Sequence, residues 1–299
     1  MTALPSSSRF SPGLIVLMLA VALFWGLNWP VMKVAVRELP PLGFRGVALA
    51  LGGLCLLAIA RVSGKPVLPP PGKWKVLSWL SLTNILAWNA LSIYAILRLP
   101  SGRAALLGYT MPIWSLLLSA LWLHEKLSAR RIAGLVLGAL GVLAMLHAEL
   151  THLAGAPVGV LLMLAGAISW ALGVVSIKRF PVPMSPVTFS GWLMLLGGVP
   201  LSLASLFLEW PQWHVPSHVG LWCFAYNVFI TMTFCYWAWN LLVLRLPVAI
   251  SSLSSLLVPL IGVASGMVLL GERPGVAEYL GAAFILGAVA TVVVPGRKR

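Results

Sequence analysis

The sequence contains no aspartate, and all six of its acidic residues are glutamate. Only 9% of the 299 residues are charged and 60% are hydrophobic, whereas soluble domains have about 25% charged residues. So few charged side chains cannot cover the surface of a soluble domain of this length. Carboxylate-rich catalytic or metal clusters are disfavoured by the same inventory. The composition predicts a polytopic membrane protein that is not an enzyme and holds no cofactor or metal.

Cysteine is also scarce. Of the three cysteines, Cys223 and Cys235 share one apolar run, but on one helix they would stand about 18 Å apart, beyond disulfide reach. The formal net charge is +14, yet the basic residues fall singly or in pairs between apolar runs and form no basic stripe. Nucleic acid is therefore not an expected partner. The expected partners are membrane lipid and a small-molecule substrate.

Apolar runs long enough to cross a bilayer recur along the chain, since a core of about 30 Å requires about 20 apolar residues. The first run continues to Val31 without a small-x-small cleavage site, which predicts a retained span rather than a signal peptide. Short connections leave no room for a soluble domain. The fold class predicted is an all-α polytopic membrane protein with ten transmembrane helices, near residues 14–33, 42–60, 76–97, 103–123, 130–147, 158–177, 187–208, 218–241, 249–270 and 277–295.

The placement of lysine and arginine predicts the orientation. Most of the twenty fall on the side that also holds both termini. The remainder fall on the other side, and these are Lys33, Arg37, Arg45, Arg98, Arg103 and Arg273. Because cytoplasmic loops carry the excess of positive charge, both termini are predicted to be cytoplasmic. Small-xxx-small spacings, such as Gly134 and Gly138, suit helix packing within one chain, so a monomer or a weak homodimer is expected.

The chain also contains an internal duplication. The matched features are Trp25 with Trp170 and Lys33 with Lys178, 145 residues apart, then the tetrapeptide LRLP at 97–100 and 244–247, Pro112 with Pro259, and Glu125 with Glu272, 147 residues apart. The two repeats, 14–149 and 156–295, each contain five predicted spans. Because five is odd, the second repeat enters the membrane inverted relative to the first. Inverted five-helix repeats are typical of secondary transporters, whose substrate site lies at the repeat interface near the bilayer midplane.

The ordered motifs resemble those of the EamA family of the drug/metabolite transporter superfamily. The motifs are W-G-x-N-x-x-x-x-K at 25–33 and the series Pro112, Glu125 and Leu127, with an echo in the ninth span. Within that family, Tyr109 before Pro112 and the paired Trp25 and Trp170 are most similar to the YddG-type aromatic amino-acid exporters. The resemblance covers about residues 14–295. It implies a multi-pass protein of the bacterial inner (plasma) membrane that exports amino acids, other metabolites or drugs.

Polar and aromatic side chains at mid-depth are the candidates for substrate binding, because polar groups that face lipid are costly. They are Trp25, Asn28, Asn84, Trp88, Tyr109, Trp170, Asn227 and Thr231. Asn84 and Trp88 share a helix face, and the repeat places Thr231 at the position of Asn84. The alternative roles are simple packing and interhelical hydrogen bonds, worth about 0.6–2 kcal/mol in membranes.

Proline in two spans suggests hinges, since its ring removes a backbone hydrogen bond. Pro112 and Pro259 are therefore candidate hinges for alternating access, or alternatively static kinks. Glu125 and Glu272 are expected to be structural charges at span ends. Because no carboxylate is expected deep in the bundle, the function predicted is facilitated uniport of amino acids and related metabolites. The alternative is efflux of lipophilic drugs or cations, which could be proton-coupled.

Overall fold

The computed structural model describes residues 12–122, 129–151, 157–245 and 257–293, and this part of the chain is helical with short connections. The first half contains α1 (Pro12–Ala35), α2 (Pro41–Val62), α3 (Trp74–Ser81), η1 (Leu82–Leu86), α4 (Ala87–Arg98), α5 (Ser101–Gly108), α6 (Met111–Trp122) and α7 (Ala129–Thr151). The second half contains α8 (Pro157–Arg179), α9 (Pro186–Leu208), η2 (Trp210–Gln212), α10 (His218–Ala225), η3 (Tyr226–Cys235), α11 (Tyr236–Arg245), α13 (Leu257–Leu270) and α14 (Val276–Val293).

Seven of the predicted spans coincide with helices that are long and apolar enough to cross a membrane. The predicted spans 130–147, 249–270 and 277–295 fall on α7, α13 and α14, where the described apolar stretches are shorter. The structure therefore confirms an all-helical protein with several membrane-spanning helices. The count of ten spans stays a prediction.

Two predicted spans are continuous but change their helical pitch at mid-length. The third runs through α3, η1 and α4, and the eighth runs through α10, η3 and α11. Both η1 and η3 are π-helical, and a shift of 147 residues places η1 inside η3. π-Helical segments are rare and often occur at functional sites, because the wider turn frees backbone carbonyls and redirects side chains. The hydroxyl of Ser169 in α8 donates to a backbone carbonyl within η1, that of Thr83, at 2.7 Å.

The two halves meet closely where α2 packs against α9. A Cβ on Gly53 would lie 2.8 Å from the carbonyl oxygen of Gly191, and one on Gly198 would lie 2.8 Å from that of Gly46. Gly46 and Gly191 are 145 residues apart, as are Gly53 and Gly198, so the repeat exchanges one contact for the other. Because residues near the start of α2 meet residues near the end of α9, the two helices run antiparallel. Glycine is needed at these positions because backbone faces backbone.

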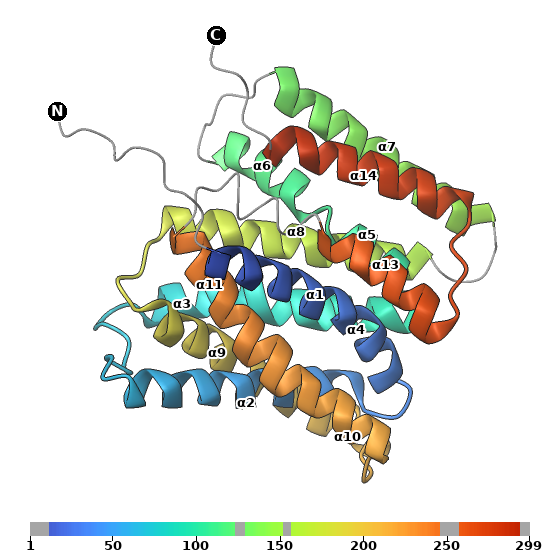
Figure 1. Ribbon diagram of the computed structural model, residues 1–299. Helices are drawn as coiled ribbons and strands as arrows, with labels where there is room; N and C mark the ends of the chain where they lie inside the picture. Colours follow the sequence, from blue (N-terminus) through green and yellow to red (C-terminus); the bar gives the residue numbers. More distant parts are fainter. Residues whose placement is uncertain (1–11, 123–128, 152–156, 246–256, 294–299) are drawn as a thin grey trace, which may run out of the picture.

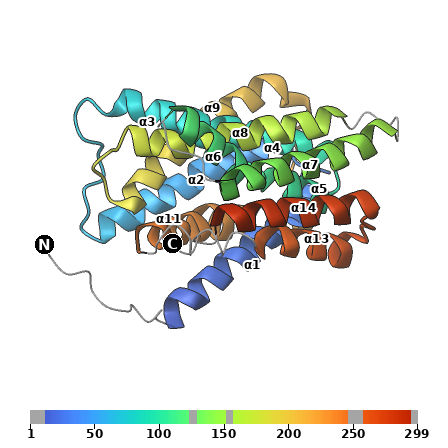
Figure 2. The ribbon, with the colours of Figure 1, turned by 90° about the horizontal axis from the view of Figure 1, so that it is seen from above.

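Helices α7 and α14 form a second antiparallel pair. A Cβ on Gly141 would lie 2.8 Å from the Ile285 side chain and 3.2 Å from the carbonyl oxygen of Gly281. This pair lies at one edge of the bundle, and α2 with α9 lies at the opposite edge (Figure 1). Seen from above, most helices of both halves run along the long axis of the bundle, and α1 runs obliquely to it (Figure 2).

The bundle has two ends, which are named here by their contents. At one end lie the start of α1 and the end of α14 (Figure 1), and we call it the terminal end. At the other end lie the connections 36–40, 99–100, 209–217 and 271–275. Four described glutamates lie there, close to helix N-termini, and we call it the capped end.

Candidate functional site

A small cavity lies where both halves of the chain meet. Its volume is about 50 Å³, which is room for only a few water molecules. The lining residues are Asn84, Ile85, Trp170, Val174, Ile177, Phe189, Ser190, Leu193, Tyr236 and Trp239. They come from η1, α8, α9 and α11, in the portions that run from mid-length towards the terminal end. The cavity therefore has aromatic and aliphatic walls with amide and hydroxyl groups among them.

A chain of aromatic rings surrounds this cavity. Trp88 meets Trp170 edge-on with ring centroids 5.7 Å apart, and Trp170 lies 6.3 Å from Tyr236. Tyr236 meets Trp25 at 5.8 Å, and Trp25 meets Trp239 at 5.6 Å. The repeat-related Trp25 and Trp170 thus pack on the same tyrosine. Such ring pairs favour tilted and edge-on geometries and present flat apolar faces to a bound solute.

The predicted polar candidates form contacts between the halves. The Asn84 amide donates to the Trp170 carbonyl at 3.4 Å, and the Thr231 hydroxyl donates to the Asn28 side chain at 3.1 Å. The repeat relates Thr231 to Asn84 and Asn28 to Gly173. The contact between Thr231 and Asn28 therefore has its counterpart in a contact between Asn84 and Gly173. A Cβ on Gly173 would lie 2.6 Å from that of Asn84. Each first span therefore touches the π-helical segment of the other half.

The eight candidates do not all reach the cavity. Asn84 and Trp170 line it, while Trp88 and Trp25 pack against rings that line it. Asn28 and Thr231 are buried and bind each other. Tyr109 packs against the hydrophobic core at the end of α5. A direct role of each of these residues in substrate binding stays a proposal.

Asn227, the remaining candidate, takes part in a buried cluster around Arg45. The Arg45 side chain is 4% exposed. One terminal nitrogen donates to the side-chain oxygen of Asn227 at 2.8 Å, and Nε donates to that of Asn89 at 3.0 Å. The other terminal nitrogen binds the same Asn89 oxygen. From the sequence we expected Arg45 beside a span end, but α2 begins at Pro41 and the side chain turns into the bundle.

The fourth predicted span is interrupted next to the candidate hinge Pro112. Helix α5 ends at Gly108, a turn follows at Tyr109 and Thr110, and α6 begins at Met111. Pro112 is thus in the first turn of α6, where proline needs no intrahelical donor and its ring is tolerated. Pro259 is buried in the first turn of α13 as described. The structure shows a break before Pro112, and movement about either proline remains a proposal.

Glu209 closes one junction at the capped end. This carboxylate is 2% exposed and follows α9 directly. It accepts hydrogen bonds from the backbone N–H groups of Leu42 at 3.0 Å and Gly43 at 3.1 Å, at the start of α2. The hydroxyls of Ser205 at 2.7 Å and Tyr94 at 2.9 Å also donate to it. A negative charge at a helix N-terminus satisfies free N–H groups and the helix dipole.

Glu272 makes the corresponding contact with α5. It accepts from the N–H groups of Ser101 at 2.6 Å and Gly102 at 3.1 Å, and from the Ser101 hydroxyl at 3.0 Å. This agrees with the structural role expected from the sequence. Its repeat mate Glu125 lies outside the described residues. The ammonium group of Lys33 caps the preceding helix, because it donates to the carbonyls of Ile96 at 2.5 Å and Leu99 at 2.8 Å at the end of α4.

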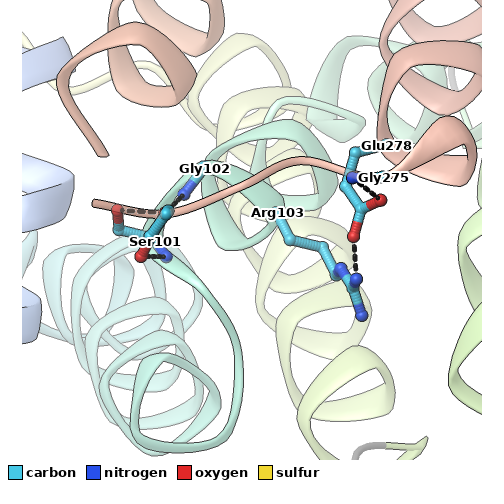
Figure 3. A network of polar contacts seen from close by, with 6 residues as sticks. Ser101, Gly102, Arg103, Gly275 and Glu278 are labelled. Atoms are coloured by element: carbon cyan, nitrogen blue, oxygen red, sulfur yellow. Dashed lines mark hydrogen bonds and ion pairs between the residues drawn. The ribbon is translucent and has the colours of Figure 1, made fainter. Parts of the chain in front are cut away.

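Arg103 extends this network to α14. Its guanidinium forms an ion pair with Glu278, whose other oxygen accepts the N–H of Gly275 at 2.9 Å (Figure 3). Figure 3 also shows Ser101 and Gly102, which precede Arg103 in the first turn of α5. The starts of α5 and α14 are therefore joined through charged side chains.

Glu38 makes a third junction, between the end of α1 and the start of α10. It accepts the Ser217 hydroxyl at 2.8 Å and the Ser217 N–H at 3.1 Å. These hydrogen bonds, from the hydroxyl first, hold the pKa of the Glu38 carboxyl below its ordinary value. Each of Glu38, Glu209 and Glu272 thus caps a helix that belongs to the other half of the chain. At the capped end, the two halves are tied together.

The described residues include no group of three or more histidine, cysteine or acidic side chains placed to hold a metal ion. Sequence reasoning missed Arg45, Tyr236 and Trp239. Tyr236 could have been found, because it is the repeat mate of Asn89, a polar residue on the same span as Asn84.

Comparisons with known proteins agree with this architecture. The profile of the EamA-like transporter family matches the chain twice, over residues 13–147 and 157–294. The "Probable amino-acid metabolite efflux pump" of Escherichia coli (strain K12) is 31% identical over 283 residues, covering 91% of this chain and 91% of the relative. The "Uncharacterized inner membrane transporter YedA" of the same strain is 28% identical over 278 residues, covering 92% and 89%.

The "Uncharacterized transporter YoaV" of Bacillus subtilis (strain 168) is 27% identical over 272 residues, covering 89% of this chain and 92% of the relative. Among solved structures, a protein crystal structure aligns with a TM-score of 0.69 and 20% identity, covering 94% of this chain and 97% of that one. At that identity the likeness shows the fold alone.

Proposed function

Since the chain belongs to the EamA-like transporter family, we propose that it exports amino acids and related small metabolites across a bacterial inner membrane. Like the named members of its family, the chain is a transporter and not an enzyme. Two relatives support the narrower statement, because their names contain amino-acid metabolite efflux and an inner-membrane location. The observation that carries the proposal is the cavity between the two halves, which has aromatic walls, one side-chain amide and two hydroxyl groups.

The carrier works by alternating access between the repeats 14–149 and 156–295, which together form one transporter domain. Two features support this mechanism. The α2–α9 contacts are exchanged by the repeat, as an inverted pseudo-twofold relation requires. The glutamate junctions found among the described residues also lie at the capped end, while the cavity lies towards the other end. The described conformation is then closed at the capped, periplasmic end.

Transport requires the cavity to enlarge, because about 50 Å³ cannot hold an amino acid. The break before Pro112 and the first turn of α13 at Pro259 are the hinges for this change. Separation at the capped end would release the Glu38, Glu209 and Glu272 junctions together. Each junction crosses from one half to the other, so rigid movement of the repeats breaks all three.

Transport is facilitated uniport. The ten lining residues are aromatic, aliphatic, amide and hydroxyl, and the described glutamates lie at the capped end instead. A proton-coupled carrier needs a group on the substrate path that titrates near neutral pH. A tyrosine hydroxyl, with an ordinary pKa of about 10, is a poor candidate for that role.

The test uses purified protein in liposomes loaded with a panel of radiolabelled amino acids. The proposal expects efflux of at least one amino acid down its gradient, absent from protein-free liposomes. It also expects that an imposed pH gradient drives no uphill movement. A chain that carries no member of the panel refutes the substrate assignment, and uphill accumulation driven by protons refutes uniport.

A further inference from the structure

The buried guanidinium of Arg45 has no acidic partner within the part of the chain that the structure describes. Its three hydrogen bonds go to the side-chain oxygens of Asn89 and Asn227, which are neutral. The glutamates at the capped end bind helix N-termini or Arg103, and none of those described contacts Arg45. Arginine stays protonated in proteins. A full positive charge therefore lies inside the membrane-spanning bundle, and the described groups that accept its hydrogen bonds are neutral amides.

An uncompensated charge in this position is expensive unless it has a use. Buried charges are normally paired, and ionisable groups within a membrane protein commonly mark the substrate path. Guanidinium has five N–H groups, and only three hydrogen bonds join Arg45 to the described residues. Donors thus remain for an anion, and the flat fork of arginine fits the two oxygens of a carboxylate.

The Arg45 cluster lies directly behind the cavity wall. The Asn89 amide donates to the carbonyl of Ile85 at 2.7 Å, and Ile85 lines the cavity. Tyr236, also in the lining, bonds to the Asn89 side chain and interacts electrostatically with Arg45. Tyr236 therefore stands between the cavity and the guanidinium. A solute in the cavity could approach Arg45 once the Tyr236 side chain moved aside.

The duplication supplies an internal comparison. The position equivalent to Arg45 in the second half is Ser190, which lines the cavity. The packing of α2 against α9 therefore does not by itself demand arginine at this place. A charge present in one repeat alone suits a solute that carries one carboxylate.

We propose that Arg45 binds the carboxylate of the transported solute, with Asn89 and Asn227 holding the guanidinium in place. This rests on the proposed function and narrows its substrate class to small monocarboxylates with an apolar side group, such as α-amino acids. The aromatic rings of Trp170 and Tyr236 would contact the side group. Lipophilic cations, the alternative substrates considered from the sequence, would be repelled by Arg45.

The first experiment needs no variant. Wild-type protein in liposomes carries radiolabelled L-phenylalanine, or whichever amino acid of the panel gives most flux, against unlabelled competitors. 3-Phenylpropionate, which has the carboxylate but no amine, is expected to compete. Phenethylamine, which has the amine but no carboxylate, is expected not to. Competition by phenethylamine without competition by 3-phenylpropionate overturns the inference. Absence of any amino-acid flux instead refutes the proposed function.

The second experiment varies the cluster. Arg45→Gln is expected to reduce flux by about tenfold or more. Arg98→Gln is the matched control, because Arg98 is exposed and its hydrogen bond among the described residues goes to the Tyr94 carbonyl. Asn227→Asp places a carboxylate beside Arg45 in nearly the same volume. It is expected to keep the protein folded, to raise its melting temperature and to weaken the same flux.

If Arg45→Gln does not fold, Asn227→Asp and the competitors decide. Wild-type flux in folded Asn227→Asp overturns the inference, since an internal carboxylate would then not compete with the substrate. All assays are repeated with chloride replaced by isethionate. Flux that requires chloride but not a carboxylate on the solute assigns Arg45 to an inorganic anion and overturns the inference as well.

Discussion

Adding one methyl group at Gly198 should weaken the contact between α2 and α9. The Cβ of an alanine there would lie 2.6 Å from the backbone nitrogen of Ala50 and 2.8 Å from the carbonyl oxygen of Gly46. Both distances are shorter than van der Waals contact. Because the atoms belong to the backbone of the facing helix, they cannot rotate away as a side chain could. The two helices must therefore separate in Gly198→Ala.

The expected cost is about 1–3 kcal/mol, as for other overpacked interiors. For a chain of this size, 1 kcal/mol corresponds to about 2–4 °C in melting temperature. Gly198→Ala should therefore lower the apparent Tm by about 2–12 °C. The measurement is thermal unfolding in detergent at a fixed heating rate, followed by tryptophan fluorescence.

Two further variants make this prediction refutable. Gly287→Ala is the control, because among the described residues its Cβ would meet the Leu137 side chain alone, at an ordinary contact distance of 3.8 Å. Its Tm should stay constant or rise slightly, since alanine favours helix by about 1 kcal/mol over glycine. Gly53→Ala, at the repeat-related position, should repeat the loss. Equal Tm values for Gly198→Ala, Gly53→Ala and the control would refute the close approach of α2 and α9.

Three predictions concern the capped end. Glu209→Gln should lower stability by about 2–3 kcal/mol, because N–H donors at the start of α2 lose a charged acceptor; an unchanged Tm would contradict the junction. Lys33→Met should cost about 0.5–2 kcal/mol by uncapping α4, as measured by the same melting assay. Glu38 has a lowered pKa in the folded state, so its stabilisation is complete above the ordinary carboxyl pKa of about 4.3 and is lost as pH falls through the lowered value. Glu38→Gln should therefore flatten the acid limb of the Tm–pH curve, and an identical limb would exclude the Ser217 contact.

The architecture was largely predictable, because the features that mark it are rare residue types. Trp25 with Trp170, and Pro112 with Pro259, stand out against an apolar background. Long apolar runs and few charges leave only a membrane-spanning helical bundle. The family resemblance was confirmed by two matches of the same profile to the chain.

The interior of the site was less predictable. Arg45 follows a span boundary by only a few residues, where a charge normally faces water, and its burial depends on Asn89 and Asn227 from distant segments. The π-helical pitch of η1 and η3 likewise leaves no periodic mark in a sequence that is apolar on every face. Tertiary contacts decide both features.

For the glutamates at the capped end, the position along the chain was predictable but the hydrogen-bond partners were not. Their position at span ends follows from the sequence, because a charge at that depth can reach the interface. Their partners do not, since Glu209 meets Leu42 across 167 residues and Glu272 meets Ser101 across 171. Those partners show that each glutamate joins the two halves.

The central claim is that amino acids pass through the cavity lined by Asn84, Trp170 and Tyr236. The most direct measurement is counterflow of a radiolabelled amino acid in liposomes that contain wild-type protein, Asn84→Ala, Trp170→Ala or the control Trp210→Ala. Trp210 is 66% exposed at the capped end. Both cavity variants are expected to remain folded and to lose about tenfold or more of the flux, while Trp210→Ala keeps it. Wild-type flux in both cavity variants would contradict the central claim.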